Sequence, residues 1–289
     1  MPRFGAHMTI AGGLTTAIEQ ALRFRCRTLQ VFVKNQQQWS APPLTDEQVQ
    51  AWRSALAATD LHPVVAHDSY LINLASADEA LWRRSCNALA EEFDRCQRLG
   101  IDYLVTHPGA HKGAGERFGI ERIVAALDRL GGEQPAGPTR LLLETTAGQG
   151  TSLGHRFEQI AEMIGRAPRP ERLGVCLDTC HVFAAGYDLR SAAQVAATLD
   201  EFNRVVGLGR LCAIHLNDSK RELGSRVDRH EHVGLGRIGS RGLAAVVRQR
   251  RLAHLPMILE TPKGVQEQTG REWDAVNLAK LRGFLRRGG

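Results

Sequence analysis

The chain has 289 residues, of which 43% are apolar, 24% charged and 6% aromatic, and its formal net charge is +6. This length can bury one large core, and the composition is too apolar for a disordered protein. No apolar run approaches the roughly 18 residues that span a bilayer, and residues 1–20 lack a signal-peptide core, so we expect a cytoplasmic protein without membrane contact. Its six cysteines form no CxxC pair, which indicates reduced thiols and no disulfides.

Short apolar runs rich in β-branched residues recur along the chain and predict strands. The segments between them show the apolar spacing of helices, and residues 49–56 follow a capping-box pattern formed by Thr45 and Gln48. Two later helices are predicted to end at glycine caps, one at Gly131 and one at Gly207. The eight predicted strands are residues 3–7, 28–34, 63–67, 101–107, 140–144, 173–178, 211–217 and 256–260.

A strand followed by a helix, repeated eight times, predicts the fold class α/β and a (β/α)8 TIM barrel. Such a barrel takes about 250 residues and buries both faces of its strands, so that each strand is an almost continuous apolar run. The sequence contains no long linker and no low-complexity segment, so we predict a single barrel domain over residues 1–289. Its active site is expected at the rim formed by the C-terminal ends of the strands.

Ionisable residues of ligand type stand at or near the C-terminal ends of the predicted strands. A ring of buried His, Asp and Glu is costly unless the residues share a partner, and metal ions are the natural partner. A mixed nitrogen and oxygen set favours zinc or manganese and suffices for two or three ions. Four carboxylates facing three dications leave a positive site, which favours phosphodiester hydrolysis. The nine candidates are His67, His107, Glu144, Asp178, His181, His215, Asp228, His230 and Glu260.

Three other features allow more than one interpretation. His7 also ends a predicted strand, as a ligand or as a core residue. Cys176 and Cys180 flank Asp178, and we interpret both as packing residues. Residues 234–239 match a dinucleotide-binding glycine pattern without a preceding strand. We interpret them as a tight loop that enters a helix whose N-terminus could face a phosphate, with a flexible turn as the alternative.

Nine segments, in chain order, carry a family resemblance: GAHMTIAGGL, KNQQQW, AHDSYLINLA, HPGAH, LETTAGQG, GVCLDTCHVFAAGYDL, HLNDSK, GSRVDRHEHVG and ILETP. Over nearly its whole length the chain resembles the endonuclease IV family of apurinic/apyrimidinic endonucleases. The resemblance implies a base excision repair enzyme that cuts duplex DNA 5′ to an abasic site and leaves a 3′-hydroxyl and a 5′-deoxyribose phosphate. It also implies removal of blocked 3′ ends, by a monomer that is associated with the nucleoid in a prokaryote.

The resemblance assigns all nine candidate ligands to three Zn²⁺ ions, with Mn²⁺ as the alternative at one site. The implied sets are His67 with His107 for the first ion; Asp178, His215 and Glu260 for the second; Glu144 as the bridge between these two; and His181, Asp228 and His230 for the third. Glu144, Glu260 and His107 are the implied catalytic residues. The two glutamates would orient the nucleophile for in-line attack on phosphorus, and the third ion would stabilise the leaving 3′-oxygen.

The family also inserts side chains into the minor groove of DNA to flip out the abasic nucleotide. By resemblance, Tyr70 and Leu71 form this wedge. Gln37 stands where the family commonly has an arginine, so we expect weaker non-specific DNA affinity or a changed preference for the opposite base, with the chemistry intact. The remaining expected DNA contacts are Asn35, Gln37, Lys220 and Arg229.

Two alternative functions stay open at this point. Metal-dependent sugar isomerases share the barrel and use rim histidines and carboxylates, but they need only one or two ions. They need neither the third ligand set nor the Tyr70 wedge. A catalytically silent binder of damaged DNA, built on a nuclease barrel, is the second alternative, and the intact ligand set argues against it.

Overall fold

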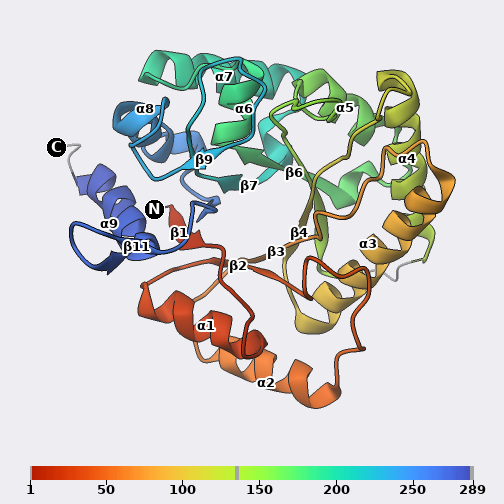
Figure 1. Ribbon diagram of the computed structural model, residues 1–289, viewed down its shortest axis with the longest axis horizontal. Coiled ribbons are helices and arrows are strands. Elements are labelled where there is room, and N and C mark those ends of the chain that lie inside the picture. Colours follow the sequence, from red (N-terminus) through yellow and green to blue (C-terminus); the bar gives the residue numbers. More distant parts are fainter. Residues whose placement is uncertain (1, 134–136, 287–289) are drawn as a thin grey trace.

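The computed structural model describes residues 2–133 and 137–286. Within these residues eight parallel strands form one sheet, in the order β1-β10-β7-β6-β5-β4-β3-β2. The strands therefore follow one another around a barrel in chain order (Figure 1). The barrel strands are β1 (Arg3–Ala6), β2 (Leu29–Phe32), β3 (Val64–His67), β4 (Tyr103–Thr106), β5 (Arg140–Glu144), β6 (Leu173–Asp178), β7 (Leu211–His215) and β10 (Pro256–Leu259).

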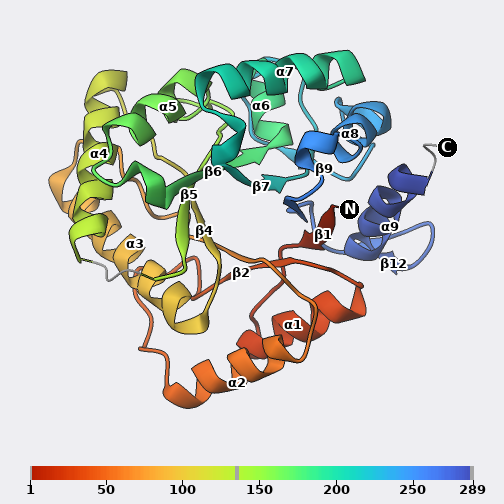
Figure 2. The same ribbon diagram turned by 180° about the vertical axis from the view of Figure 1, so that it is seen from behind.

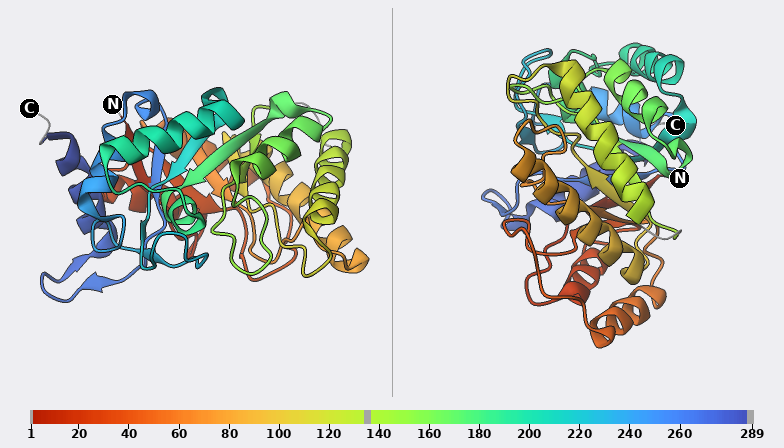
Figure 3. Two further views of the ribbon diagram at one scale, coloured as in Figure 1. Left: turned by 90° about the horizontal axis from the view of Figure 1, so that it is seen from above. Right: turned by 90° about the vertical axis from the view of Figure 1, so that its right-hand side faces the viewer.

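Helices cover the outside of the barrel, as both face-on views show (Figures 1 and 2). They are α1 (Leu14–Arg23), α2 (Asp46–Ala57), α3 (Glu79–Leu99), α4 (Glu116–Glu133), α5 (Phe157–Arg166), α7 (Ala192–Val205), α8 (Gly239–Val247) and α9 (Trp273–Arg286). The short helix α6 (Thr179–Ala185) directly follows β6 and is almost entirely buried inside this ring of helices (Figure 1). Among the described residues, no helix is long and apolar enough to cross a membrane. Two small hairpins pair β8 (Asp218–Ser219) with β9 (His230–Glu231) and β11 (Val265–Gln266) with β12 (Arg271–Glu272). In the view from above, the β11–β12 hairpin and long loops extend from one side of the barrel (Figure 3).

The barrel closes along a seam between β1 and β2. The backbone N–H of Arg27 donates to the carbonyl of Phe4 at 2.9 Å, and that of Met8 donates to the carbonyl of Gln30 at 2.8 Å. Between these two bonds, the backbone of Gly5 lies so close to Thr28 that a Cβ on Gly5 would stand 2.7 Å from the Thr28 carbonyl carbon. A glycine at this position therefore lets the two strands approach.

Two apolar clusters account for the burial of both strand faces. The larger one lies between the strands and the helices and includes the fully buried Trp52, Phe157 and Phe202. All six cysteines lie in the described part of the chain, and each is a buried thiol. The smaller cluster fills the barrel interior and consists of Val65, Val105, Leu142, Cys176, Cys212, Ala213 and Ile258.

The (β/α)8 barrel predicted from the sequence is confirmed, with one wrong helix end. The capping box of α2 is present, because the Gln48 N–H donates to Thr45 Oγ1 and the Thr45 N–H donates to Gln48 Oε1. Gly207 follows α7 with a φ of 91°, as a terminating glycine should. Gly131, however, does not end α4, which continues to Glu133. A glycine inside a helix costs only about 1 kcal/mol relative to alanine, so helical hydrogen bonding continues past it.

We predict that Gly5→Ala destabilises the protein by about 1–3 kcal/mol, because the added methyl forces the β1–β2 seam apart. Chemical denaturation followed by circular dichroism measures this change. Gly165→Ala is the matched control, since a Cβ on Gly165 in α5 meets nothing within 4 Å and should be neutral or slightly stabilising. Equal stability of the two variants would contradict the assigned role of Gly5.

Candidate metal centre at the barrel mouth

The candidate ligands stand at the mouth because of the two-residue period of the strands. In a strand, residues i and i+2 point to the same face. Five interior residues, namely Val65, Leu142, Cys176, Ala213 and Ile258, are followed two positions later by His67, Glu144, Asp178, His215 and Glu260. Val105 on β4 and His107, directly after β4, show the same relation. A layer of ligand-type side chains therefore lies directly above an apolar layer.

The first ligand group consists of His67, His107 and Glu144, whose ligand atoms all lie within 4.8 Å of one another. The Nε2 atoms of both histidines stand 3.1 Å from Glu144 Oε2. His67 Nδ1 donates to the carbonyl of Asp68 at 2.8 Å, which turns Nε2 toward the carboxylate. Glu144 itself is fully buried.

The second group contains Glu144, Asp178, His215 and Glu260, again within 4.8 Å. His215 Nδ1 lies 2.9 Å from Glu144 Oε1 and 3.1 Å from Glu260 Oε2. Burial by itself raises the pKa of Glu260, but the charges of His215, His67 and His230 together outweigh it and hold that pKa at about 2. Asn217 holds two of the carboxylates in place, because its Nδ2 donates to Asp178 Oδ2 at 2.6 Å and its Oδ1 accepts from the Glu260 backbone N–H at 2.8 Å. Glu144 thus belongs to both groups.

The third group forms around His181 and His230, and the LDTCH segment explains its position. Asp178 caps α6, accepting the His181 backbone N–H at 2.9 Å, so the spacing of three residues places both side chains at the mouth. His181 Nε2 lies 3.1 Å from Asp228 Oδ2, and His230 Nε2 lies 3.5 Å from both Asp228 and Asp178. Their Nδ1 atoms donate to the carbonyls of Thr145 and Glu260, respectively.

Cys180 also lies within ligand range of Asp228 and His230. Burial raises the pKa of its thiol to about 12, so the sulfur is held as a thiol and not as a thiolate. Its Sγ faces the backbone carbonyl of Arg229 at 3.6 Å. These observations fit the interpretation of Cys180 as a packing residue, and Cys176 lies in the apolar interior of the barrel.

Opposite charges dominate the electrostatics of the cluster. Burial by itself raises the pKa of Glu144, but the charges of His215 and His107 and the hydrogen bonds from His107 and His181 together outweigh it and hold that pKa well below its usual range. Burial likewise opposes the charged form of His181, yet Asp178 and Asp228 raise the pKa of His181 well above its usual value. A metal ion that binds such an imidazole takes the place of its proton, so metal binding at this cluster depends on pH.

The β8–β9 hairpin carries part of the third group and is fixed by a buried carboxylate. Ser219 pairs with His230 across the hairpin. The Asp218 side chain accepts backbone N–H bonds from Gly236 at 3.1 Å, Ile238 at 3.0 Å and Gly239 at 3.2 Å. The prediction that residues 234–239 present a helix N-terminus to a phosphate is therefore wrong, because Asp218 already occupies the donors.

The predicted wedge residues lie beside the first group. Tyr70 is 63% exposed as a whole residue, and its ring packs edge-on against Phe32 with centroids 5.7 Å apart. Leu71 is half-buried next to it. A buried ion pair connects this segment to residues 35–39. Lys34 Nζ lies 3.2 Å from Glu92 and donates to the carbonyls of residues 38 and 39, and Glu92 accepts the backbone N–H of Ser69 at 3.3 Å. Asn35 and Gln37 are exposed on that neighbouring loop.

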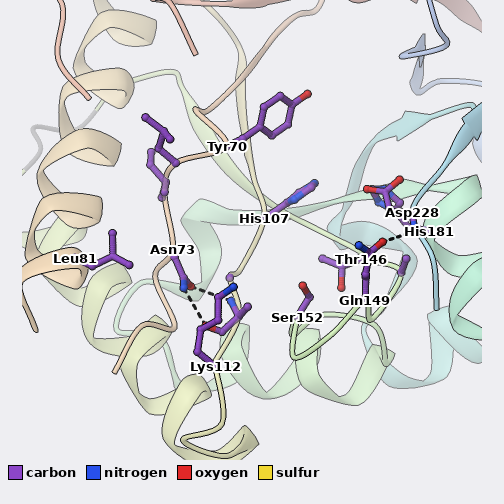
Figure 4. Close-up of a pocket in the computed structure, with 15 residues that line it drawn as sticks. Tyr70, Asn73, Leu81, His107, Lys112, Thr146, Gln149, Ser152, His181 and Asp228 are labelled. Carbon is purple, nitrogen blue, oxygen red and sulfur yellow. Dashed lines mark hydrogen bonds and ion pairs between the residues drawn. The ribbon is translucent and has the colours of Figure 1, made fainter. Parts of the chain in front are cut away.

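A cavity of about 400 Å³ runs from Tyr70 past His107 to His181 and Asp228 (Figure 4). A second hollow of about 700 Å³ continues along Lys112, Gln149 and Arg229. Arg229 is exposed and donates to the carbonyl of Asp228 at 2.6 Å. Lys220, also exposed, stands 3.7 Å from Glu231, so a carboxylate offsets part of its charge.

Sequence reasoning missed the buried amides around the ligands, Gln30 and Asn217. His7, left open above, accepts a hydrogen bond at its Nδ1 from Gln30 Nε2 at 3.0 Å, and it belongs to none of the ligand groups of the described residues. Burial lowers the pKa of His7 to about 3, so its imidazole is neutral. A polar residue inside an apolar strand, as Gln30 is in LQVF, was the available signal.

The donor chemistry fits metal ions. Imidazole nitrogens and carboxylate oxygens converge in adjoining groups that share Glu144, Asp178 and His230. The outer nitrogens of His67, His181 and His230 donate to carbonyl oxygens, an arrangement that orients metal-ligating histidines in proteins. The residues therefore form a multinuclear metal-binding site.

Comparison with known proteins shows which family the chain resembles. Residues 18–282 match the family described as the xylose isomerase-like TIM barrel. The probable endonuclease 4 of Chloroflexus aggregans is 50% identical over 286 residues, which cover 99% of both chains. That of Geobacter sulfurreducens is 47% identical over 98% of this chain and 94% of its own length.

Among solved structures, endonuclease IV from Thermus thermophilus matches with a TM-score of 0.86 and 39% identity, covering 99% of this chain and 100% of that chain. The chain belongs to the endonuclease IV family, as its sequence segments predict. A D-tagatose 3-epimerase-like protein reaches a TM-score of 0.74 at 15% identity, over 98% of this chain and 97% of its own. That likeness shows the shared fold alone.

We predict that Asp218→Asn destabilises the protein by about 1–3 kcal/mol, because an amide in place of the carboxylate turns N–H donors toward backbone N–H donors. Urea denaturation measures the loss. Asp200→Asn serves as the control, since its carboxylate lies on the exposed face of α7 and pairs with Arg251, a contact worth at most about 1 kcal/mol. A wild-type unfolding midpoint for Asp218→Asn would disprove the anchoring role.

Proposed function

We propose that this protein is a metal-dependent endonuclease of base excision repair. It hydrolyses the phosphodiester 5′ to abasic sites in duplex DNA, leaves a 3′-hydroxyl and a 5′-deoxyribose phosphate, and removes blocked 3′ ends. One observation carries the proposal: a member of the endonuclease IV family has three adjoining groups of nitrogen and oxygen ligands at its barrel mouth. A sugar epimerase barrel does not need a third group.

The groups would hold three Zn²⁺ ions, with Mn²⁺ as the alternative at one site. His67 and His107 serve the first; Asp178, His215 and Glu260 the second; His181, Asp228 and His230 the third; and Glu144 joins the first two. Bound ions of this kind supply Lewis-acid stabilisation of phosphate oxygens and activate water. The mixed donor set suits these metals better than Mg²⁺ or Ca²⁺.

The chain's own carboxylates and imidazoles orient the reactants. Glu144 directs Oε2 toward His67 and His107 and Oε1 toward His215, so its position between two groups suits it to align a nucleophile for in-line attack. Glu260 flanks the second group from β10 and shares that task. His107 is one-third exposed at the cavity wall, where it would meet the phosphate.

DNA recognition would use the exposed residues around the same cavity. Tyr70 and Leu71 stand at one end as a wedge for the space left by a missing base, where unstacking costs least. Asn35, Gln37, Lys220 and Arg229 are exposed on neighbouring loops and would contact the DNA. Lys34 and Glu92, the buried pair between the wedge loops, keep the loops together.

Incision of a duplex with one central abasic-site analogue tests the function. Zinc-loaded protein should cut once, 5′ to the lesion, and a chelated sample should not cut. Glu144→Gln should reduce incision at least about 100-fold and leave DNA binding intact, because it removes the shared carboxylate. Glu162→Gln, on the exposed face of α5, is the control and should cut normally.

Failure of zinc-loaded wild-type protein to cut would reject the proposed function and favour a silent DNA binder or a sugar-converting enzyme. Full activity of Glu144→Gln would reject the assignment of the site while keeping the function. Mapping the product ends distinguishes 5′ incision from other cleavage.

We further predict that Gln37→Arg strengthens binding to undamaged duplex DNA and steepens its salt dependence. One added phosphate contact raises the magnitude of the slope of log K against log[salt] by about 0.9. Fluorescence anisotropy at several salt concentrations measures this slope. Gln50→Arg adds the same charge on the exposed outer helix α2 and should leave the slope unchanged. Equal slopes for both variants would place Gln37 outside the DNA interface.

A further inference from the structure

Gln30 is a fully buried amide on β2, beside the seam that closes the barrel. Its register partner on β3, Val65, belongs to the apolar interior cluster. A buried amide among apolar neighbours costs several kcal/mol unless its hydrogen bonds are made, so such a residue needs specific partners. Gln30 has three of them: His7, His215 and Glu260.

The partners determine which way the amide points. Gln30 Nε2 lies 2.6 Å from Glu260 Oε1, and a carboxylate that binds a cation is ionised and only accepts hydrogen bonds. The amide nitrogen must therefore face Glu260, where one N–H donates to it. The second N–H then points to His7 Nδ1 at 3.0 Å.

The orientation of the amide in turn determines the tautomer of His215. Gln30 Oε1 lies 2.7 Å from His215 Nε2. Because a carbonyl oxygen only accepts, Nε2 must carry the proton, and the neutral ring has its lone pair on Nδ1. Nδ1 is the atom that faces Glu144 and Glu260, at 2.9 and 3.1 Å.

His215 differs in this respect from its neighbours. His67, His181 and His230 each turn Nε2 toward the cluster, and their Nδ1 atoms donate to backbone carbonyls. His215 turns Nδ1 inward, and the side chain of Gln30 holds its outer nitrogen. The Gln30 amide thus contacts two members of the second ligand group: its oxygen accepts from the imidazole of His215, and its nitrogen donates to the carboxylate of Glu260.

We propose that Gln30 is a positioning residue of the second metal site, which fixes His215 as the Nε2–H tautomer with Nδ1 toward the metal and clamps Glu260 beside it. The inference rests on the proposed function, because it concerns ligands of the proposed metal site. Gln30 touches no reacting atom. Its loss should accelerate metal release and lower kcat while leaving KM nearly unchanged.

The tautomer is tested first, by long-range ¹H–¹⁵N correlation spectra of the zinc-loaded protein labelled at histidine. His215→Gln identifies the His215 signals by their disappearance. The expected result is a protonated Nε2 and a metal-bound, unprotonated Nδ1. A protonated Nδ1 would overturn the proposal, whatever the enzyme's activity.

Metal retention is tested with Gln30→Met, which keeps the length of the side chain and removes its polar atoms. Zinc release to a competing chelator should become about 10- to 100-fold faster, as for the loss of other outer partners of metal ligands. Gln30→Glu retains an oxygen that accepts from His215 Nε2–H but has no N–H for Glu260. It should keep the tautomer signature and still release zinc faster than wild type.

Gln159→Met is the matched control, because Gln159 is an equally buried glutamine that accepts three backbone N–H bonds at the start of α5. It should lower the melting temperature and release zinc at the wild-type rate. Wild-type zinc release from folded Gln30→Met and Gln30→Glu would overturn the inference, and incision by wild type would then leave the proposed function standing. Absence of incision by zinc-loaded wild type rejects the function alone, since the tautomer and release measurements do not depend on it.

Discussion

The carboxylate of Glu144 is the contact on which the mouth of the barrel depends. It is fully buried at the end of β5, and its two oxygens face histidines from β3, β7, α6 and the loop after β4. An unpaired charge at this depth would cost several kcal/mol, so the surrounding imidazoles and the carboxylate require one another. The first and second ligand groups share this residue, and the chemistry between them therefore follows from its position.

The scaffold makes this arrangement precise because each of these strands places a ligand two residues after a side chain of the apolar interior. The close approach at Gly5 completes the ring of strands, and Gln30 links the seam to the second ligand group. Outside the barrel, Asp218 ties the β8–β9 hairpin to the loop before α8, which brings His230 back over the mouth. Rigid strands thus supply most ligands, and an anchored hairpin supplies the others.

Much of the fold could be read from the sequence, because parallel barrel strands are short apolar runs and each is followed by a helix. The strand ends also revealed the candidate ligands, since polar residues such as Glu144 and Asp178 directly follow buried ones. Local patterns were less reliable where two structures satisfy the same pattern. Gly131 is compatible with a helix cap and with a helix interior. The glycines of residues 234–239 are compatible with a phosphate-binding loop and with a loop whose N–H groups bind a carboxylate of the same chain.

The sequence by itself determined the class of fold, the types of ligand and the membership of the endonuclease IV family, because these depend on periodicity and on motifs that are local in the chain. Tertiary structure alone decided which nitrogen of His215 faces inward and that Gln30 contacts both His215 and Glu260. Gln30 is 185 positions from His215 and 230 positions from Glu260 in the sequence. Their contacts exist only because closing the barrel brings β2, β7 and β10 around one mouth.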